Sequence, residues 1–468
     1  MPDHRALNFR RPLSRFSLLG TALLLAFGTS AQAQSLQAVY EAARSYDATY
    51  LAARALAESA QGRAMQADST MKPKVGVGIS EQHQNYSVPF STEVPDPANP
   101  GGTMLVSGRA SLSGDTVTAG FNGSWALYNR ANKIGADQAQ RGLLAAQADL
   151  VIADQDLIVR VAQAYFDVLA AKDALSTTRT SRAAIAEQLA SAKRNFEVGT
   201  ATITDTREAQ ARFDLARAAE IAADNDLRSK NVTLDQLVGR VGVTPSPLAV
   251  PVALPAVMPT NVEPWVERAT AEHPQIRKAQ IGYDVAHLET QKARAGNSVT
   301  VDLTGNAGLQ RAWGSAAELS TGVGTTRSAT LTLSVNLPLY TGGFVQGRVM
   351  ETLALEEKSR NDLDFARRSV EESTRRAFLG VESLTAQVSA LEAAESSSQL
   401  ALDATKLGYK VGVRVNLDVL NAQTQLFTTQ RDLAKARYDV LVNSLRLRQA
   451  SGQLTASDVI AINQLLAR

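Results

Sequence analysis

The chain has 468 residues, of which 44% are hydrophobic, 20% are charged and only 5% are aromatic. This composition excludes an intrinsically disordered chain and a protein built from many transmembrane helices. The formal net charge is +2 and there is no cysteine, so disulfide bonds and thiolate metal sites are excluded as well.

Residues 1–33 have the three parts of a secretory signal peptide. Four arginines precede a short apolar stretch, FSLLGTALLLAFG, and the small-residue site Ala31-Gln32-Ala33 follows it. We therefore expect export and a mature chain that begins at Gln34. Removing four arginines and one aspartate changes the net charge to −1, which leaves no basic footprint for nucleic acid. No later stretch has 18 consecutive apolar residues, so we expect a periplasmic, secreted or outer-membrane β-barrel protein.

The remaining sequence repeats itself once. The segment NFEVGTATITDTREAQARF at 195–213 returns as GYKVGVRVNLDVLNAQTQL at 408–426, a shift of 213 residues. These copies predict two tandem repeats, 34–239 and 265–468. The segment between them, 240–264, holds six prolines and cannot continue a helix, so we expect an extended linker there, outside the membrane and near the middle of the helical body.

Both repeats are expected to contain the same elements in the same order: a helix, a strand pair, a very long helix, a turn and a second helix. In the first repeat these elements fall at 35–70, about 74–127, 131–198, 199–202 and 203–239. In the second they fall at 262–296, about 298–340, 343–410, 411–415 and 416–451, followed by a C-terminal segment. A helix of 68 residues would be roughly 100 Å long. Apolar residues along both long helices recur at coiled-coil spacing, which predicts helical partners.

The predicted strands alternate apolar and polar side chains. Leu331, Leu333 and Val335 alternate with Thr332 and Ser334, and the lengths of about ten to thirteen residues suit tilted membrane-spanning strands. A soluble sandwich would show the same alternation, although export and strand length favour the membrane. Six aromatic residues are candidates for interfacial girdles: Trp125, Tyr128 and Tyr340 at one end, and Tyr86, Phe90 and Trp313 at the other.

Four strands cannot close a membrane barrel, because the smallest such barrels have about eight. An open sheet edge has no hydrogen-bond partners in lipid. If the strands span a membrane, the barrel must be shared between protomers, so that two copies supply eight strands and three copies supply twelve.

The sequence offers no enzyme signature. GGFVQG at 342–347 has the spacing of a phosphate-binding loop, but Arg348 and Val349 stand where Lys and Ser or Thr are required. The histidines after the signal segment, His83, His273 and His287, are too scattered to suggest a metal site. We therefore expect no catalytic residue, no cofactor and no metal.

The repeated turns differ in one respect. Gly199 and Gly412 suit helix C-caps, and Asp205 and Asp418 fall in the first turn of the next helix, where the helix dipole favours acids. Helix capping alone explains these four residues. It does not explain the extra donors of the second copy, Arg414 and Tyr409, whose counterparts are Ala201 and Phe196. Donors on one hairpin could join acceptors such as Asp205 on a neighbouring hairpin.

The sequence resembles the TolC family of outer-membrane export channels, also called outer membrane factors, over nearly the whole mature chain. The resemblance is carried by RNFEVGTATITD at 194–205, GYKVGVRVNLDVL at 408–420 and LAKARYDVLVNSLRLRQASGQL at 433–454. It implies a mixed α and β membrane protein that forms a homotrimer. Each protomer contributes four strands to a twelve-stranded β-barrel, which continues as a long α-helical coiled-coil barrel across the periplasm.

The resemblance also implies roles for residues at the helical tips. Thr204, Asp205, Tyr409 and Arg414 match the family's gate lock between neighbouring hairpins. Asp418 matches the acid of the constriction ring, whereas Asn421 stands where the family often has a second acid, so each trimer would carry three ring carboxylates. Six residues match the sites that dock a periplasmic adaptor: Val198, Gly199, Thr200, Val411, Gly412 and Val413.

The implied function is a passive duct, gated at the periplasmic helix ends, for type I protein secretion or multidrug efflux. Its partners would be a periplasmic adaptor, an inner-membrane ABC, RND or MFS transporter, the exported protein or drug, and outer membrane lipid. The expected location is the outer membrane of a Gram-negative bacterium. The alternative is a periplasmic coiled-coil structural or adaptor protein without a membrane barrel.

Overall fold

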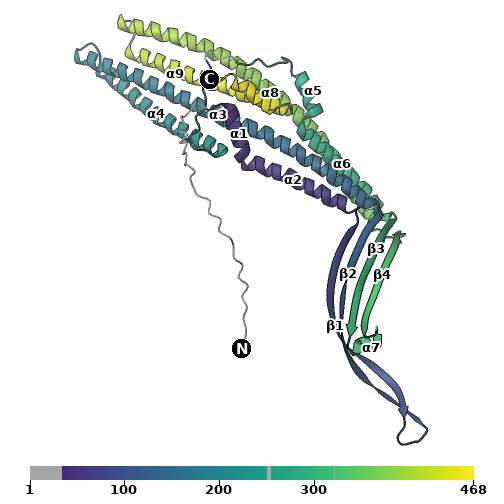
Figure 1. The fold of residues 1–468 in the computed structure, drawn as a ribbon. Coiled ribbons are helices and arrows are strands. Elements are labelled where there is room, and N and C mark those ends of the chain that lie inside the picture. The colour runs from purple at the N-terminus through teal and green to yellow at the C-terminus, as the bar shows by residue number, and fades with distance from the viewer. Residues whose placement is uncertain (1–33, 250–253, 321, 468) are drawn as a thin grey trace, which may run out of the picture.

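The protein is elongated, with a body of helices at one end and a curved β-sheet at the other (Figure 1). The structure is a computed structural model that describes residues 34–249, 254–320 and 322–467. The expected signal segment, 1–33, and part of the expected linker, 250–253, lie outside the described residues.

The first repeat contributes four helices to the body, and the break between its first two helices follows from local sequence. The helices of the first repeat are α1 (Leu36–Tyr46), α2 (Ala48–Ser69), α3 (Arg130–Glu197) and α4 (Ile203–Val238). Asp47 separates α1 from α2 because its backbone leaves the helical region and its carboxylate accepts a hydrogen bond from the N–H of Tyr50, which caps α2.

The second repeat has matching helices. They are α5 (Glu263–Glu272), α6 (Pro274–Arg294), a short 3₁₀ turn η1 (Ala295–Asn297), α8 (Phe344–Lys410) and α9 (Asn416–Ala450). The helical stretch expected at 262–296 is therefore broken. His273, which precedes Pro274, has an extended backbone (φ −62°, ψ 128°), because a proline disfavours helical geometry in the residue before it.

Two long hairpins, α3–α4 and α8–α9, lie side by side, and α3 also packs against α9 (Figure 1). The helices α2 and α6 cover the remaining lengths of α3 and α8. The predicted seam on α8 is present: Val381 and Val388 are buried, and Leu384 and Leu391 pack beside Val388 against Leu433 and its neighbours on α9. The long helices are therefore held by interhelical apolar contacts, as their heptad spacing predicts.

The largest apolar core lies in the middle of the helical body. It joins α1, α3, α4, α9 and a short C-terminal helix, α10 (Ala456–Asn463). Tyr165 of α3 is fully buried there. Its hydroxyl donates to the carbonyl of Gln34 (2.9 Å) and accepts from the N–H of Ser246 (2.8 Å), so the start of the described chain and the linker are fixed to the same helix. Burial raises the pKa of the Tyr165 hydroxyl to about 12.

The sheet has four antiparallel strands in the order β1 (Lys74–Pro95), β2 (Thr103–Asn129), β3 (Thr300–Trp313) and β4 (Gly324–Asn336). A short helix, α7 (Ser315–Ser320), connects β3 to β4. Leu333 pairs with Leu303, and Thr332 pairs with Thr304, so apolar and polar side chains alternate between the two faces as predicted. Within the described residues, the outer edges of β1 and β4 pair with no other strand.

The expected strand lengths are wrong for the first pair. β1 has 22 residues and β2 has 27, so they form a two-stranded ribbon that runs well beyond β3 and β4 (Figure 1). Tyr86 and Phe90 lie in this ribbon and not in a girdle at the end of the four-stranded sheet. β4 ends at Asn336, so Tyr340 lies outside the strand. Pro338 follows closely and lacks the N–H that a further ladder bond would need.

None of the helices in the described parts of the chain is both long enough and apolar enough to cross a membrane.

Candidate functional site

The tips of the two hairpins, which contain the repeated turns, have the same backbone structure. Val198 and Val411 are the C-cap residues of α3 and α8, and Gly199 and Gly412 follow with φ of 78° and 79°. The next N–H groups donate back to the carbonyls of Asn195 and Gly408 at 2.8 Å in both copies. Glycine is favoured at both positions because other residues rarely adopt this left-handed conformation.

The helices that leave the two turns begin differently. Thr202 caps α4 in a reciprocal capping box: its hydroxyl accepts from the N–H of Asp205 (3.2 Å), and the Asp205 carboxylate accepts from the N–H of Thr202 (2.9 Å). Val415 takes the equivalent place before α9 and has no side chain that can cap it. The aspartate of the second copy, Asp418, therefore has no threonine partner and is available to another donor.

The nearest charged partner of Asp418 is Arg414, whose Nη1 lies 3.6 Å from the aspartate Oδ2 in an ion pair. The arginine side chain lies over Gly408, where an added Cβ would come within 2.8 Å of the Arg414 Cγ. Both charged side chains are substantially exposed, 60% for Arg414 and 38% for Asp418. An exposed pair of this kind contributes only about 0–1 kcal/mol, so Arg414 can exchange this partner for another at small cost.

The residues of the expected lock are not joined within one chain. The Tyr409 hydroxyl accepts a hydrogen bond from Nδ2 of Asn195 (3.0 Å), and the Thr204 side chain is exposed. Among the described residues, no hydrogen bond or ion pair links Arg414 or Tyr409 to Thr204 or Asp205. Both bonds that Asp205 accepts from Thr202 end on Oδ2, which leaves Oδ1 for a donor from elsewhere.

Other residues, which the sequence comparison of the two turns did not single out, connect the hairpins. Gln188 of α3 donates to the side-chain oxygen of Asn416, a buried residue at the start of α9. Arg212 of α4 donates to the side-chain oxygen of Asn421 (3.0 Å), which is exposed. Asn421 therefore serves as an acceptor for the neighbouring hairpin of its own chain. The sequence does distinguish Asn195, the hydrogen-bond donor to Tyr409, because its counterpart in the second copy, Gly408, has no side chain.

An apolar cluster holds the same hairpins together just behind the tips. Leu420 of α9 is fully buried against Ile185, Leu189 and Ala192 of α3 and Ala209 of α4. The turns themselves extend beyond this cluster. Val198, Val411 and Val413 are 72%, 66% and 77% exposed, and Thr200 donates its hydroxyl to the Asn195 carbonyl (3.1 Å). The expected docking residues therefore form an exposed apolar rim on a firmly packed base.

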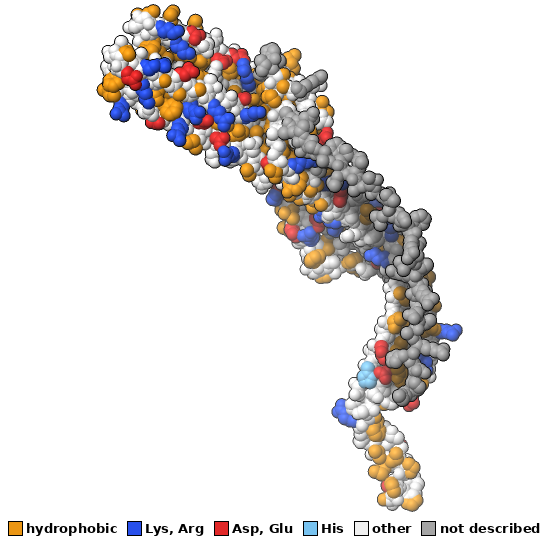
Figure 2. All heavy atoms as spheres, turned by 60° about the vertical axis from the view of Figure 1, so that its left-hand side comes forward, with side chains coloured by type: hydrophobic (Ala, Val, Ile, Leu, Met, Phe, Trp, Pro, Cys, Tyr) orange, Lys and Arg blue, Asp and Glu red, His pale blue; other side chains and the backbone are white. Residues whose placement is uncertain are grey.

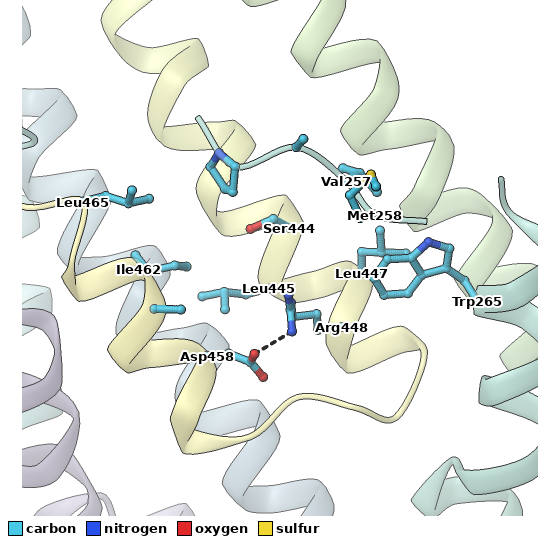
Figure 3. A pocket seen from close by; sticks show the side chains of 13 residues that line it. Val257, Met258, Trp265, Ser444, Leu445, Leu447, Arg448, Asp458, Ile462 and Leu465 are labelled. Carbon is cyan, nitrogen blue, oxygen red and sulfur yellow. Dashed lines mark hydrogen bonds and ion pairs between the residues drawn. The ribbon is translucent and has the colours of Figure 1, made fainter. Parts of the chain in front are cut away.

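A small cavity of about 180 Å³ lies far from these tips, between the linker, α9 and α10 (Figure 3). Its lining is mostly apolar, with Trp265 and Leu447 at one side and Ile462 at the other. Arg448 and Asp458 are already paired (2.7 Å). In the described residues there is no cluster of three or more side chains suited to a metal ion. The side chains that line the cavity pack the linker against α9 and α10.

The chain is similar in sequence to proteins of one known family. The profile of the family described as "Outer membrane efflux protein" matches residues 29–240 and 265–453, two stretches separated at the linker. The outer membrane protein TolC of Vibrio cholerae is 28% identical over 446 residues, covering 95% of this chain and 97% of that protein. The alkaline protease secretion protein AprF of Pseudomonas aeruginosa is 32% identical over 309 residues, which cover 65% of this chain and 63% of AprF.

Solved structures agree at the level of the fold. The CmeC outer membrane channel of Campylobacter jejuni superposes with a TM-score of 0.74 over 97% of both chains, at 16% sequence identity. The sequence and the fold therefore lead to the same group of proteins.

Proposed function

The chain belongs to the outer membrane efflux protein family, and from this premise we propose that three copies form a passive exit duct across the periplasm and the outer membrane. The duct is a transport component and not an enzyme. Membership of the family also sets aside the alternative of a periplasmic coiled-coil protein without a barrel. The energy for export comes from an inner-membrane transporter, which a periplasmic adaptor connects to the duct.

The sheet supports the membrane end of this proposal. Val75, Val77, Leu331 and Leu333 are all strongly exposed in the single chain and lie on one face of the sheet. An apolar face of this kind is suited to lipid, but the unpaired edges of β1 and β4 are not. Pairing β1 of one copy with β4 of the next removes both edges. Three copies then give a closed barrel of twelve strands.

The hairpin tips support the gated end. We propose that Arg414 and Tyr409 on one hairpin and Asp205 and Thr204 on a neighbouring hairpin close the trimer, with the free Oδ1 of Asp205 as the acceptor. Arg414 suits this role because its planar guanidinium can bond two acceptors at once. Within a single chain, Arg414 is weakly paired with Asp418. In the trimer we place Asp418 at the constriction.

The exposed rim of Val198, Val411 and Val413 supports adaptor docking, because three copies would present it at one end of the duct next to the gate. Relatives whose names refer to protease secretion and to efflux favour an exported protein or a drug as the substrate. The binding energy of an adaptor at this rim can then break several weak lock contacts and open the gate.

Purified protein in detergent tests the proposal. We expect a trimer that resists dissociation in detergent until heated, that fractionates with the outer membrane and that forms pores in planar lipid bilayers. A protein that remains monomeric, or that stays in the soluble periplasmic fraction, would refute the duct.

A further inference from the structure

The ribbon formed by β1 and β2 beyond the four-stranded sheet has an unusual distribution of side chains. β2 pairs with β3 only from Asp115 to Asn129, whereas β1 and β2 stay paired as far as Pro95 and Thr103. Residues 84–95 and 103–114, twelve on each strand, therefore extend past the sheet. At about 3.3 Å per residue the ribbon is roughly 40 Å long. The proposed function leaves this ribbon without a role.

The apolar side chains change faces where the ribbon leaves the sheet. Within the sheet, one face holds Val75, Val77 and Ile79, and the opposite face holds Gly76, Gly78, Ser80 and Gln82. Beyond Gln84 the first face becomes mostly polar, with Asn85, Ser87 and Ser91, and Leu105 is its one large aliphatic side chain. The opposite face becomes apolar and carries seven large side chains, which we call the ribbon strip: Tyr86, Val88, Phe90, Val94, Met104, Val106 and Leu112.

Charged residues mark the level of this change. On the first face, Glu81, His83 and Asp115 follow Ile79, and Nδ1 of His83 lies 2.5 Å from Oδ1 of Asp115. Charged groups on the lipid side of a membrane strand are costly near the midplane and cheap near the interface. The face that contacts lipid in the proposed barrel therefore ends here, and the ribbon lies outside the membrane.

The ribbon strip is mostly exposed in the single chain. Phe90 is 42% exposed and lies across the paired strand at Gly108, where an added Cβ would come within 3.1 Å of its ring. At the base, α7 packs on β2: an added Cβ at Gly114 would come within 3.0 Å of Ala316, and the Ser315 hydroxyl accepts a hydrogen bond from the N–H of Ser113 (3.1 Å). Leu112 is buried at this level. Hydrophobic side chains gather toward the ribbon end in Figure 2. A contiguous apolar surface outside a membrane usually marks an interaction site.

The side of the sheet on which the ribbon strip begins indicates which surface covers the strip. Tyr86 and Leu112 continue the face of Gln82 and Gln84, which is the polar face that lines the lumen of the proposed barrel. Three ribbons therefore rise around one axis with their strips on the inner side. A barrel of twelve strands, with about 4.8 Å between strands and a tilt of about 40°, has a radius on the order of 12 Å. Each ribbon is long enough to reach the axis.

We propose that the three ribbons pack their strips against one another and form an apolar cap over the outer end of the duct. This inference rests on the proposed trimeric duct and adds a second closing element to it, at the opposite end from the helical tips. The cap would narrow the idle exit, in series with the helical tips, and widen when an exported molecule separates the ribbons.

Single cysteines test the contact without background, because the chain has none of its own. We expect Phe90→Cys, on the strip, to give a covalent dimer within the trimer under mild oxidation. The matched control Ser91→Cys, on the polar face of the same strand, should give none. The absence of the Phe90→Cys dimer, or equal cross-linking by both variants, would overturn the cap and indicate that lipid, solvent or another protein faces the strip.

A shortened ribbon provides the second measurement. Gln84 and Gly114 are directly paired, so residues 85–113 can be replaced by an Asn-Gly hairpin turn. We expect this variant to form heat-sensitive trimers as before and to conduct more than the full-length channel. Trimers with unchanged conductance would overturn the cap while leaving the duct intact. Failure of the full-length protein itself to form trimers or pores would instead refute the duct and the cap together.

Discussion

The guanidinium of Arg414 lies 3.6 Å from the carboxylate of Asp418 in the same chain. The corresponding aspartate of the first repeat, Asp205, accepts its bonds from Thr202. The two turns are nearly identical, but their aspartates have different bonding partners. The difference originates at one position, which is Thr202 in the first copy and Val415 in the second.

Val415→Thr should give the second turn the capping box of the first. The new hydroxyl can bond Asp418, which draws this carboxylate away from Arg414 and stabilises the start of α9 by about 0.5–2 kcal/mol. Released from Asp418, Arg414 is freer to bond the acceptor on a neighbouring hairpin. We expect a lower idle conductance and slower hydrogen exchange at 416–419. The control Val413→Thr lies outside the capping position, and the idea fails if both variants behave alike.

The two faces of the sheet should tolerate charge differently. Leu333→Arg places a cation on the face proposed to contact lipid and should cost about 2–4 kcal/mol near the bilayer midplane, whereas Thr332→Arg places it on the lumen side and should be tolerated. The yield of heat-sensitive trimers in the outer membrane measures the difference. Equal yields for these adjacent positions would speak against a membrane barrel.

The linker should be accessible from the periplasm. Met258 is 70% exposed in the described part of the linker, close to the middle of the helical body. We expect Met258→Cys to react with a thiol reagent that reaches the periplasm but not the cytoplasm. The control Leu447→Cys lies nearby but is buried and should not react. Labelling of Met258→Cys only from the cell exterior would show that the linker does not face the periplasm.

Acid should weaken the helical body through Asp47. Oδ2 of this buried carboxylate lies 2.8 Å from Arg160 Nη1, and the hydrogen bond from Arg160 lowers the pKa of Asp47. Its stabilising effect is therefore complete above the unfolded-state pKa of about 3.9 and is lost as the pH falls through the lower folded-state value.

Asp47→Asn keeps a capping oxygen for α2 but removes the charge. Because Arg160 is partly exposed, we expect a loss of roughly 1–3 kcal/mol at neutral pH and a weaker dependence on acid, measured by thermal unfolding. Asp156→Asn removes an exposed carboxylate from the same arginine and should have little effect. A larger effect from Asp156→Asn would show that burial of Asp47 is not what matters.

The family and the mixed fold class could be predicted because both depend on features that repeat along the chain. Proline density, glycine after a long helix and apolar residues at heptad spacing each have a local physical cause. The twelve-stranded trimer stays a prediction, because it depends on contacts between copies.

Other features depend on contacts that sequence spacing does not contain. The bond between Asn195 and Tyr409 joins residues 214 positions apart, and the pairing of the ribbon continues across a change of apolar face. The capping box was different, because Thr202 stands three residues before Asp205 in the sequence. The capping box at Thr202, and its loss at Val415, were therefore predictable from the sequence.

The proposed lock predicts a specific pattern of non-additivity. Each exposed contact contributes only about 0–1 kcal/mol, but three-fold repetition allows several kcal/mol if the contacts add. A change of one kcal/mol alters the ratio of open to closed channels about fivefold. Arg414→Ser and Asp205→Ala should remove the same bond and therefore have similar effects, whereas Tyr409→Phe removes a separate hydroxyl.

Single-channel recording in planar lipid bilayers tests the central claim, a trimeric duct held shut at its helical tips, most directly. The account predicts a small conductance for the unaltered protein, a modest rise for Arg414→Ser and a larger rise for Arg414→Ser with Tyr409→Phe. Asp205→Ala should match Arg414→Ser and add little to it. Asp418→Ala should change cation selectivity but leave the closed conductance nearly unchanged. Channels in which Arg414→Ser and Asp205→Ala have no effect, or in which their effects add in full, would contradict the account.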